Sequence, residues 1–232
     1  PSVIVMKLPR GLEELEWVAW IVSRYFRQAL LVAVGLQKYM TPSQTELLKR
    51  FFAKVQPSRG FGKARALIAT NPLPDGAAEE PVIQATHRID VLPNKSLKLF
   101  GVSATYGSSR IDPGSRFLID SLAANIRVSE TERLLDLGCG NGTLAVSMAL
   151  LSPSAHIAAV DQSASAVRAT RVSAMLNCVE DRVSVRQLDG TDGIPDSSVH
   201  QVVLNPPFHT GHAVDPAIAH KLFEHASRVL VP

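Results

Sequence analysis

The feature that most constrains the fold is the segment Asp136-Leu137-Gly138-Cys139-Gly140-Asn141-Gly142. It follows the apolar residues Leu134 and Leu135 and precedes an apolar run, 143–151, that is typical of a buried helix. Glycines at alternate positions let the backbone turn tightly and approach a ligand without Cβ clashes. The start of a helix also directs unpaired N–H groups toward such a ligand. The segment therefore predicts a strand–loop–helix ligand site in an α/β fold.

A second carboxylate, Asp161, lies 19 residues beyond Gly142, at the end of the next predicted strand. A carboxylate there can accept hydrogen bonds from both hydroxyls of a ribose. A dinucleotide would bring a pyrophosphate to the helix start, where Asp136 would repel it. S-adenosylmethionine instead has an ammonium group, a ribose and no phosphate. We predict S-adenosylmethionine as the cofactor, held by Asp136, Gly138, Gly140, Asn141, Gly142 and Asp161.

Asp189 and Gly190 follow the apolar residues 183–187, which predict a third strand. We expect the Asp189 carboxylate to accept from the adenine amino group and the Gly190 N–H to face a ring nitrogen. The alternative is that Asp189 caps its own loop, at Thr191 or Asp192.

The tetrapeptide Asn205-Pro206-Pro207-Phe208 follows a further apolar strand, 199–204. The prolines remove two backbone donors and stiffen the turn, so that it presents mainly hydrogen-bond acceptors. The Asn205 amide oxygen and the Pro206 carbonyl could hold both hydrogens of a planar amino group, with its lone pair aimed at a methyl donor. Phe208 could stack on a base. Asn205, Pro206 and Phe208 are therefore the candidate catalytic residues, and the alternative is a rigid turn at a strand end.

The histidines and cysteines point to no metal or disulfide. His209 and His212 resemble a ligand pair, but no carboxylate or cysteine completes a site, so we expect no metal. We expect Cys139 and Cys178 to be free thiols. The apolar stretch 17–35 contains Arg24 and Arg27 and no secretory signal is visible, which indicates no membrane association and a cytoplasmic protein.

The charge is uneven along the chain. The net charge of residues 1–120 is +6, and that of residues 121–232 is −3. A basic stretch interleaved with Phe51, Phe52 and Phe61 can neutralise phosphates and stack on bases. It predicts RNA contacts at Lys49, Arg50, Lys54 and Arg59. The alternative is a solvated helix face whose phenylalanines point into the core.

The periodicity of the chain predicts a doubly wound, Rossmann-like α/β sheet after residue 110, preceded by a partial α/β layer. The expected elements are strand 3–8, helix 11–26, strand 29–35, helix 41–55, strand 65–70, a linker at 71–81, a hairpin made of 82–92 and 96–106, helix 117–125 and helix 216–229. We expect three parts, at 1–80, 81–110 (a linker hairpin) and 111–232. The chain opens on a strand and closes on a helix end, so we expect a piece of a longer protein whose last strands follow Pro232.

These motifs together resemble class I S-adenosylmethionine-dependent methyltransferases, and more narrowly the ribosomal RNA guanine-N2 methyltransferases of the RsmC/RlmG type. Residues 111–118, Ile-Asp-Pro-Gly-Ser-Arg-Phe-Leu, resemble the "LDxGxRxL" segment of that family, with Ile in place of Leu. The resemblance implies a degenerate N-terminal methyltransferase-like domain that helps to bind RNA. Residues 1–70 would be its second half, with Lys7-Leu8-Pro9-Arg10 where a catalytic copy carries Asn-Pro-Pro-Phe.

The resemblance also implies a monomer that methylates guanine N2 in ribosomal RNA or a ribosomal subunit. Three alternatives stay open. The same turn serves methylation of adenine N6 and of protein glutamine amides. The chain could also be a non-catalytic RNA-binding assembly factor that retains a cofactor pocket.

Overall fold

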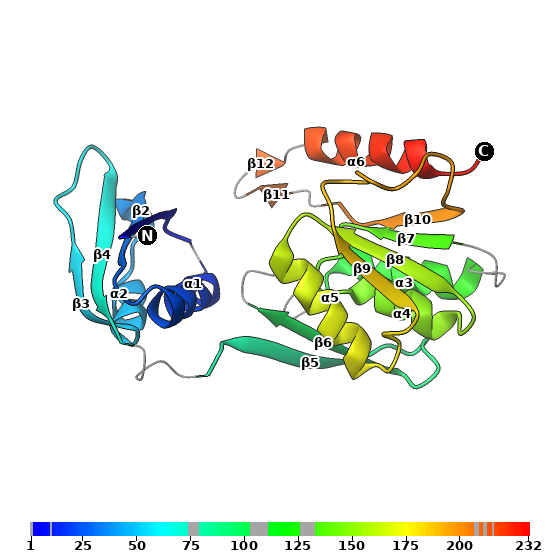
Figure 1. Ribbon diagram of the computed structural model, residues 1–232, viewed down its shortest axis with the longest axis horizontal. Coiled ribbons are helices and arrows are strands. Elements are labelled where there is room, and N and C mark those ends of the chain that lie inside the picture. The colour runs from blue at the N-terminus through cyan, green and yellow to red at the C-terminus, as the bar shows by residue number, and fades with distance from the viewer. Residues whose placement is uncertain are drawn as a thin grey trace. The chain divides into compact units, whose positions relative to one another are not determined.

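The computed structural model describes residues 2–9, 11–73, 79–102, 111–125, 133–206, 209–210, 213–214 and 216–232. The chain divides into two compact units, Pro1–Val82 (unit 1) and Ile83–Pro232 (unit 2). Figure 1 shows unit 1 in blue to cyan and unit 2 in green to red.

Unit 1 is a four-stranded sheet with helices on one face. The strand order is β1-β2-β4-β3, in which β1 and β2 are parallel and the other neighbours are antiparallel. Its elements are β1 (Val3–Lys7), α1 (Leu12–Tyr25), β2 (Leu30–Leu36), the 3-10 helix η1 (Gln37–Tyr39), α2 (Pro42–Lys49), β3 (Phe52–Pro57) and β4 (Ala64–Pro72).

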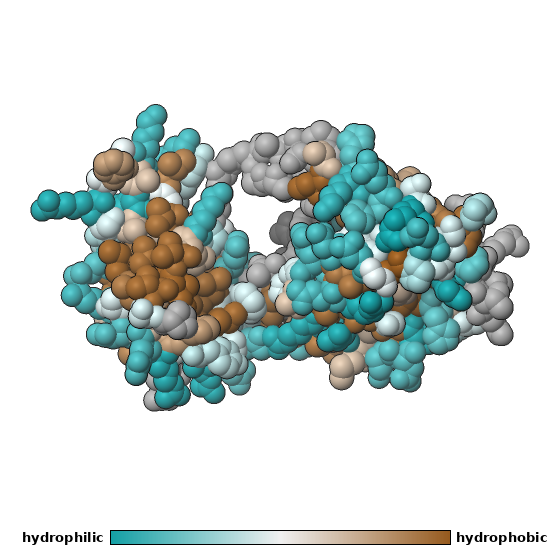
Figure 2. Space-filling view, turned by 45° about the horizontal axis from the view of Figure 1, so that its top comes forward, coloured by the Kyte–Doolittle hydropathy of each residue, from teal (hydrophilic) through white to brown (hydrophobic). Residues whose placement is uncertain are grey.

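The core of unit 1 lies between this sheet and its two helices. Leu31 and Ala33 of β2 pack there with Leu15 of α1 and Leu48 of α2. Because side chains alternate along a strand, the intervening residues face away from the core. Exposed apolar side chains of β1 and β2 include Val3, Val5, Val34 and Leu36. Figure 2 shows hydrophobic residues gathered into one continuous area on unit 1.

The helix expected over 41–55 is wrong in its second half. It begins as expected, with Thr41 as the cap and its backbone N–H donating to Gln44 Oε1 at 2.9 Å, but α2 ends at Lys49. Residues 52–57 form β3, which pairs with β4. Phe51 and Phe52 continue the helical spacing of Leu47 and Leu48, but strand pairing buries both rings. Tertiary context overrides the local periodicity here.

Unit 2 is built on a parallel sheet of order β10-β7-β8-β9. This confirms the Rossmann-like doubly wound prediction. Its described elements are β5 (Val82–Arg88), β6 (Ser96–Val102), α3 (Pro113–Asn125), β7 (Arg133–Leu137), α4 (Thr143–Leu151), β8 (His156–Asp161), α5 (Ala164–Leu176), β9 (Val183–Gln187), β10 (Gln201–Leu204), β11 (His209–Thr210), β12 (Ala213–Val214) and α6 (Pro216–Val229). Helix α3 starts four residues before the predicted Phe117, at Pro113.

The β5–β6 hairpin belongs to the core of unit 2, which corrects its prediction as a separate linker. Its residues Ile89, Leu97 and Leu99 are fully buried in the same cluster as α4 and the sheet. Ser173 of α5 and the C-cap residue Asn177 satisfy the edge of β6. Asn177 bonds the N–H and the carbonyl of Lys98, and Ser173 Oγ accepts from Phe100 N at 2.9 Å. A strand edge covered by a helix must find such partners, because buried backbone groups are costly when unpaired.

Among the described residues, no helix combines the length and the apolar character that crossing a membrane requires.

Leu99→Ala should lower the free energy of unfolding of unit 2 by about 2–5 kcal/mol, because it leaves a cavity in a fully buried cluster. Val91→Ala is the control, since Val91 is 40% exposed near the turn of the same hairpin and should change stability by less than about 0.5 kcal/mol. Denaturant unfolding monitored by circular dichroism measures both. If Leu99→Ala lowers the free energy of unfolding as little as Val91→Ala does, the hairpin is a loosely attached linker.

Candidate functional site

The candidate site lies at the carboxyl ends of the parallel strands. The chain runs from β7 outward to β8 and β9, then returns to pair β10 with the other side of β7. Open α/β sheets bind ligands where the strand order reverses in this way. A cavity of about 390 Å³ opens there, and its lining includes Gly138, Asp161, Asp189, Gly190 and Asn205. This volume is typical of a small-molecule site.

The glycine-rich loop has a backbone that only glycine adopts easily. Gly138, Gly140 and Gly142 have φ of 82°, 55° and 85°. At Gly142 a Cβ would also come within 3.1 Å of the Thr170 backbone. Thr170 Oγ1 in turn donates to the Gly140 carbonyl at 3.1 Å. Packing against α5 therefore fixes the loop that borders the cavity.

Asp136 is a buried carboxylate with one unused oxygen. Its Oδ2 accepts from Ala145 N at 2.8 Å, whereas its buried Oδ1 has no partner. Burial raises the pKa of Asp136 to about 7, against the lowering effect of the Ala145 hydrogen bond. Asp136 lines a small recess that shares Gly138, Gly140 and Asn205 with the larger cavity. An orphaned carboxylate oxygen in such a recess suits a cationic group of a ligand.

Asp161 borders the larger cavity with a fixed carboxylate. Its Oδ2 accepts from Gly140 N at 3.0 Å, and its Oδ1 accepts from Ser163 N at 2.8 Å. Each carboxylate oxygen has a second acceptor position. Asp161 therefore holds the loop and retains acceptor positions for two ligand hydroxyls.

Asp189 and Gly190 line the same cavity. Asp189 is exposed and lies 3.6 Å from Lys221 Nζ of α6. Gly190 has a φ of 57°, and a Cβ there would meet the His225 ring at 2.7 Å. Glycine is thus required at position 190 both by the backbone and by the imidazole.

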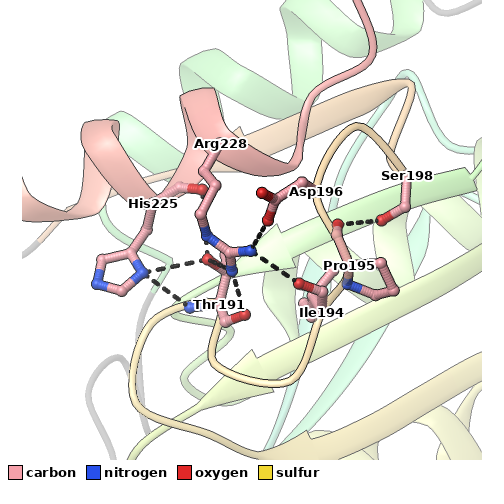
Figure 3. Close-up of polar contacts among 7 residues, drawn as sticks. All are labelled: Thr191, Ile194, Pro195, Asp196, Ser198, His225 and Arg228. Carbon is pink, nitrogen blue, oxygen red and sulfur yellow. Dashed lines mark hydrogen bonds and ion pairs between the residues drawn. The ribbon is translucent and has the colours of Figure 1, made fainter.

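Figure 3 shows how α6 holds the loop that carries these two residues. His225 Nδ1 accepts from Thr191 N at 3.3 Å and lies 3.1 Å from Thr191 Oγ1. Arg228 donates to the carbonyls of Thr191 and Ile194 and pairs with Asp196. The loop after β9, which forms one wall of the cavity, is therefore positioned by α6, a helix that begins more than 20 residues later in the chain.

Asn205 has its amide orientation fixed from one side. Its Nδ2 donates to both oxygens of Asp112, at 3.1 Å each, and to Ser115 Oγ at 2.9 Å. With both amide hydrogens engaged, Oδ1 is the atom that remains to accept from a substrate. The arrangement provides a pre-oriented acceptor where the recess and the cavity meet.

Asp112 is ionised at neutral pH. Partial burial opposes ionisation, but hydrogen bonds from Ser115, Asn205 and Gly114 outweigh it and hold the pKa of Asp112 below its usual value. Pro206 is buried beside Asn205, whereas Phe208 lies outside the described residues.

The sequence alone predicts the positions of some of the remaining site residues better than those of others. Asn141 is buried, and its Oδ1 accepts from Thr143 at 2.6 Å, so part of its role is to fix the start of α4. Sequence reasoning noted Asp112 and Ser115 only within a family-like segment and gave them no role. It missed His225 and Arg228, because no local pattern connects them to Thr191.

The four residues predicted to contact RNA do not share one environment in unit 1. Lys49 pairs with Glu46, and Arg50 pairs with Glu16, each at 2.7 Å. Lys54 in β3 and Arg59 beyond its end are exposed. Nearby, Phe51 and Phe52 are buried, whereas Phe61 is 91% exposed.

No group of three or more histidines, cysteines and acidic residues among the described positions could hold a metal ion. Both cysteines are free. Burial, the largest effect, raises the pKa of the Cys139 thiol.

Comparison with known proteins gives one family and several relatives. The family described as "Methyltransferase small domain" matches residues 96–232. Two curated relatives, from Streptomyces coelicolor and Pseudomonas fluorescens, are both named ribosomal RNA large subunit methyltransferase G. Each is 31% identical to this chain, over 236 and 229 residues that cover 100% and 98% of it. The chain spans only 61% and 59% of these relatives' lengths.

A solved structure shares the fold over the whole chain. It is described as "T. Thermophilus 16S rRNA N2 G1207 methyltransferase (RsmC) in complex with AdoMet and Guanosine". The TM-score is 0.79 at 19% identity, and the match covers 100% of this chain and 62% of that one.

His225→Ala should leave the Thr191 N–H without its acceptor and lower the free energy of unfolding by about 1–3 kcal/mol. Amide hydrogen exchange at Thr191 should speed up in proportion. His225→Asn should restore most of the protection, since an amide oxygen can replace Nδ1 as acceptor. His220→Ala, at an exposed position of the same helix, is the control and should change neither quantity. Unchanged exchange at Thr191 in His225→Ala would show that the ring does not hold the loop.

Proposed function

Because the chain belongs to the methyltransferase small domain family, we propose that its site transfers a methyl group from S-adenosylmethionine to guanine N2 of ribosomal RNA. The observation that carries this proposal is the fixed amide of Asn205 at the junction of the recess and the cavity. The names of the relatives support the same reaction class and substrate.

The residues of the cavity fit this cofactor. The orphaned Asp136 Oδ1 would accept from the ammonium group, and the free acceptor positions of Asp161 would accept from the ribose hydroxyls. Asp189 and the Gly190 N–H would face the adenine. When bound, the cofactor supplies the electrophilic methyl group.

Asn205 would act on the guanine amino group. This group is planar and weakly nucleophilic, because its lone pair is delocalised into the ring. Acceptors at Asn205 Oδ1 and the Pro206 carbonyl would hold both N–H bonds and favour a pyramidal nitrogen. Asp112 and Ser115 keep that oxygen, and not the amide nitrogen, directed at the substrate. The acceleration would come mainly from positioning and electrostatics.

Proton release needs no strong base in this scheme. Once the nitrogen has gained the methyl group, its remaining protons become acidic, and one can pass to water. Phe208 would complete the pocket by stacking on the base.

Unit 1 would bind RNA and take no part in methyl transfer. We propose that it is the second half of a degenerate methyltransferase-like domain. In both units a parallel strand leads to a helix, through β1 and α1 or through β10 and α6. At the end of its strand unit 1 carries Lys7-Leu8-Pro9-Arg10, where unit 2 carries Asn205-Pro206-Pro207-Phe208. With no asparagine at that place, unit 1 lacks the side-chain acceptor that the proposal assigns to Asn205. Action on ribosomal RNA would place the protein in the cytoplasm.

Asn205→Ala should lower the single-turnover rate of methyl transfer by on the order of 10²–10³, as expected for loss of one preorganised polar group. The affinity for S-adenosylmethionine should change little, because the amide faces the substrate. Radiolabel transfer to unmethylated ribosomal RNA measures the rate, and mass mapping of the RNA identifies the base. A full single-turnover rate in Asn205→Ala would exclude this mechanism, and a methylated adenine would exclude guanine.

The matched variant for this test is Asp112→Asn, which keeps the size of the side chain but replaces one of the two carboxylate oxygens that orient Asn205 with a donor. Misorientation of a positioned group should lower the rate by about 10²-fold with cofactor affinity unchanged. Glu180→Gln removes a carboxylate on the exposed surface and should have no effect.

Cofactor affinity should depend on pH through Asp136, whose pKa is raised to about 7 in the cofactor-free protein. Only the ionised carboxylate pairs with an ammonium group. The dissociation constant for S-adenosylmethionine should therefore fall about tenfold per pH unit between about pH 5 and pH 7, then level off. Asp136→Asn should bind more weakly and lose this dependence. Calorimetric titration at several pH values measures it.

Stability gives an independent check on the same carboxyl group. Because its folded-state pKa is raised, its contribution to stability is present at low pH and is lost as pH rises. The free energy of unfolding without cofactor should thus fall between about pH 4 and pH 7 in the wild type more than in Asp136→Asn. Equal pH profiles for the two proteins would mean that Asp136 is not the titrating group.

A further inference from the structure

The turn that joins β3 to β4 presents an aromatic ring to solvent on an ordered support. Phe61 N and Ala64 O are 2.9 Å apart, and Ala64 N and Phe61 O are 3.0 Å apart, which closes a two-residue turn at Gly62 and Lys63. Gly62 has a φ of 57°, as such hairpin turns require at their first central position. In Figure 1 the tip of this hairpin projects beyond both helices of unit 1.

Phe61 is 91% exposed, more than any other large hydrophobic residue described. A single exposed apolar residue is common on protein surfaces and needs no special explanation. The surroundings of Phe61 are what set it apart, because both neighbours are exposed glycines that leave its ring accessible from either side.

Positive charge surrounds the ring. Arg59, Lys63 and Arg65 are exposed, and among the described residues none of them takes part in an ion pair. The sequence has no Asp or Glu between residues 47 and 74. The 3-10 helix η1 contacts the tip, because Gln37 N donates to Lys63 O at 2.9 Å. Through this contact η1 contributes a further cation, Lys38, and a partly exposed ring, Tyr39.

This environment differs from that of the other cations in unit 1. Lys49 and Arg50 each have a carboxylate partner at 2.7 Å, so their charge is largely neutralised locally. The tip therefore offers uncompensated cations together with a ring that can stack. Proteins that bind single-stranded nucleic acid combine these two features.

We infer that the β3–β4 tip, residues 59–65, is a contact site for unpaired nucleotides of RNA, with Phe61 stacked on a base and Arg59 and Lys63 on phosphates. This inference rests on the proposed function, which makes RNA the substrate, and assigns its recognition to a particular surface. Unpaired nucleotides are favoured over a duplex because only an unstacked base offers its face to a ring. An anionic membrane would also attract these residues, and the experiment separates the two.

The test measures binding of the full chain to a fluorescently labelled single-stranded RNA of about 12 nucleotides by anisotropy. Phe61→Ala and Phe61→Leu should each weaken binding by about 5- to 150-fold, the equivalent of one lost stacking contact. Phe61→Tyr keeps an aromatic face and should bind within about threefold of the wild type. Melting temperature and affinity for S-adenosylmethionine should be unchanged in all three.

A charge-matched pair of double variants tests the cations. Arg59→Gln with Lys63→Gln should reduce the slope of log affinity against log salt by about 1.4, or about 0.7 for each lost phosphate contact. Lys49→Gln with Arg50→Gln removes the same charge from ion-paired positions and should change the slope much less. If the two double variants change the salt slope equally, the slope depends only on the net charge of the protein, and the inference is overturned.

The remaining outcomes also decide between the proposals. If Phe61→Leu binds RNA as tightly as the wild type, the contact is generically apolar and not a stacking contact. Binding to vesicles of anionic phospholipid is measured for the same variants. If these variants lose binding to the vesicles but not to RNA, the tip is a membrane contact. Either result overturns the inference and leaves the methyl-transfer proposal standing. If the wild type binds S-adenosylmethionine but no RNA, single- or double-stranded, the ribosomal RNA substrate is wrong, and the inference falls with it.

Discussion

The parallel pairing of β7 with β8 on one side and with β10 on the other is the constraint on which the site depends. It brings the loops after four strands to one edge of the sheet, so that residues from 136 to 205 line connected cavities. Strand pairing alone would leave these loops free to move. Side chains from helices then fix them: Thr170 holds the glycine-rich loop, Asp112 orients Asn205, and His225 holds the turn after Gly190.

Buried polarity is the cost of this arrangement, and under the proposed function it would favour a cationic ligand. Asp136 is buried with one oxygen unpaired, which opposes its ionisation. A cationic ligand relieves that penalty, whereas a neutral or anionic one does not. A structural carboxylate could have been satisfied by a neighbouring side chain, as Asp112 is. Under the proposed function, Asp136 would bind the ligand, whereas Asp112 positions Asn205.

Charge is distributed unevenly between the two units. The half of the chain that contains unit 1 is basic, and the half with most of unit 2 is acidic. Repulsion between an acidic catalytic half and RNA phosphates would slow encounter unless another surface attracts them. Under the proposed function, unit 1 would supply such a surface where its cations are not paired with Glu16 or Glu46. Ion pairing, and not the count of basic residues, decides which part of the stretch is available.

Local sequence determined a large part of this protein. The glycine-rich loop and the apolar strands predicted the order of elements in unit 2 and the candidate residues Asp136, Asp161, Asp189 and Asn205, because turn geometry and strand–helix periodicity are local properties. Only the tertiary structure decided the rest. It converted residues 52–57 from helix to strand by pairing them with β4, and it placed the β5–β6 hairpin in the core. It also joined Asn205 to Asp112 across 93 positions and Thr191 to His225 across 34, since hydrogen bonds between distant segments leave no periodic trace in the chain.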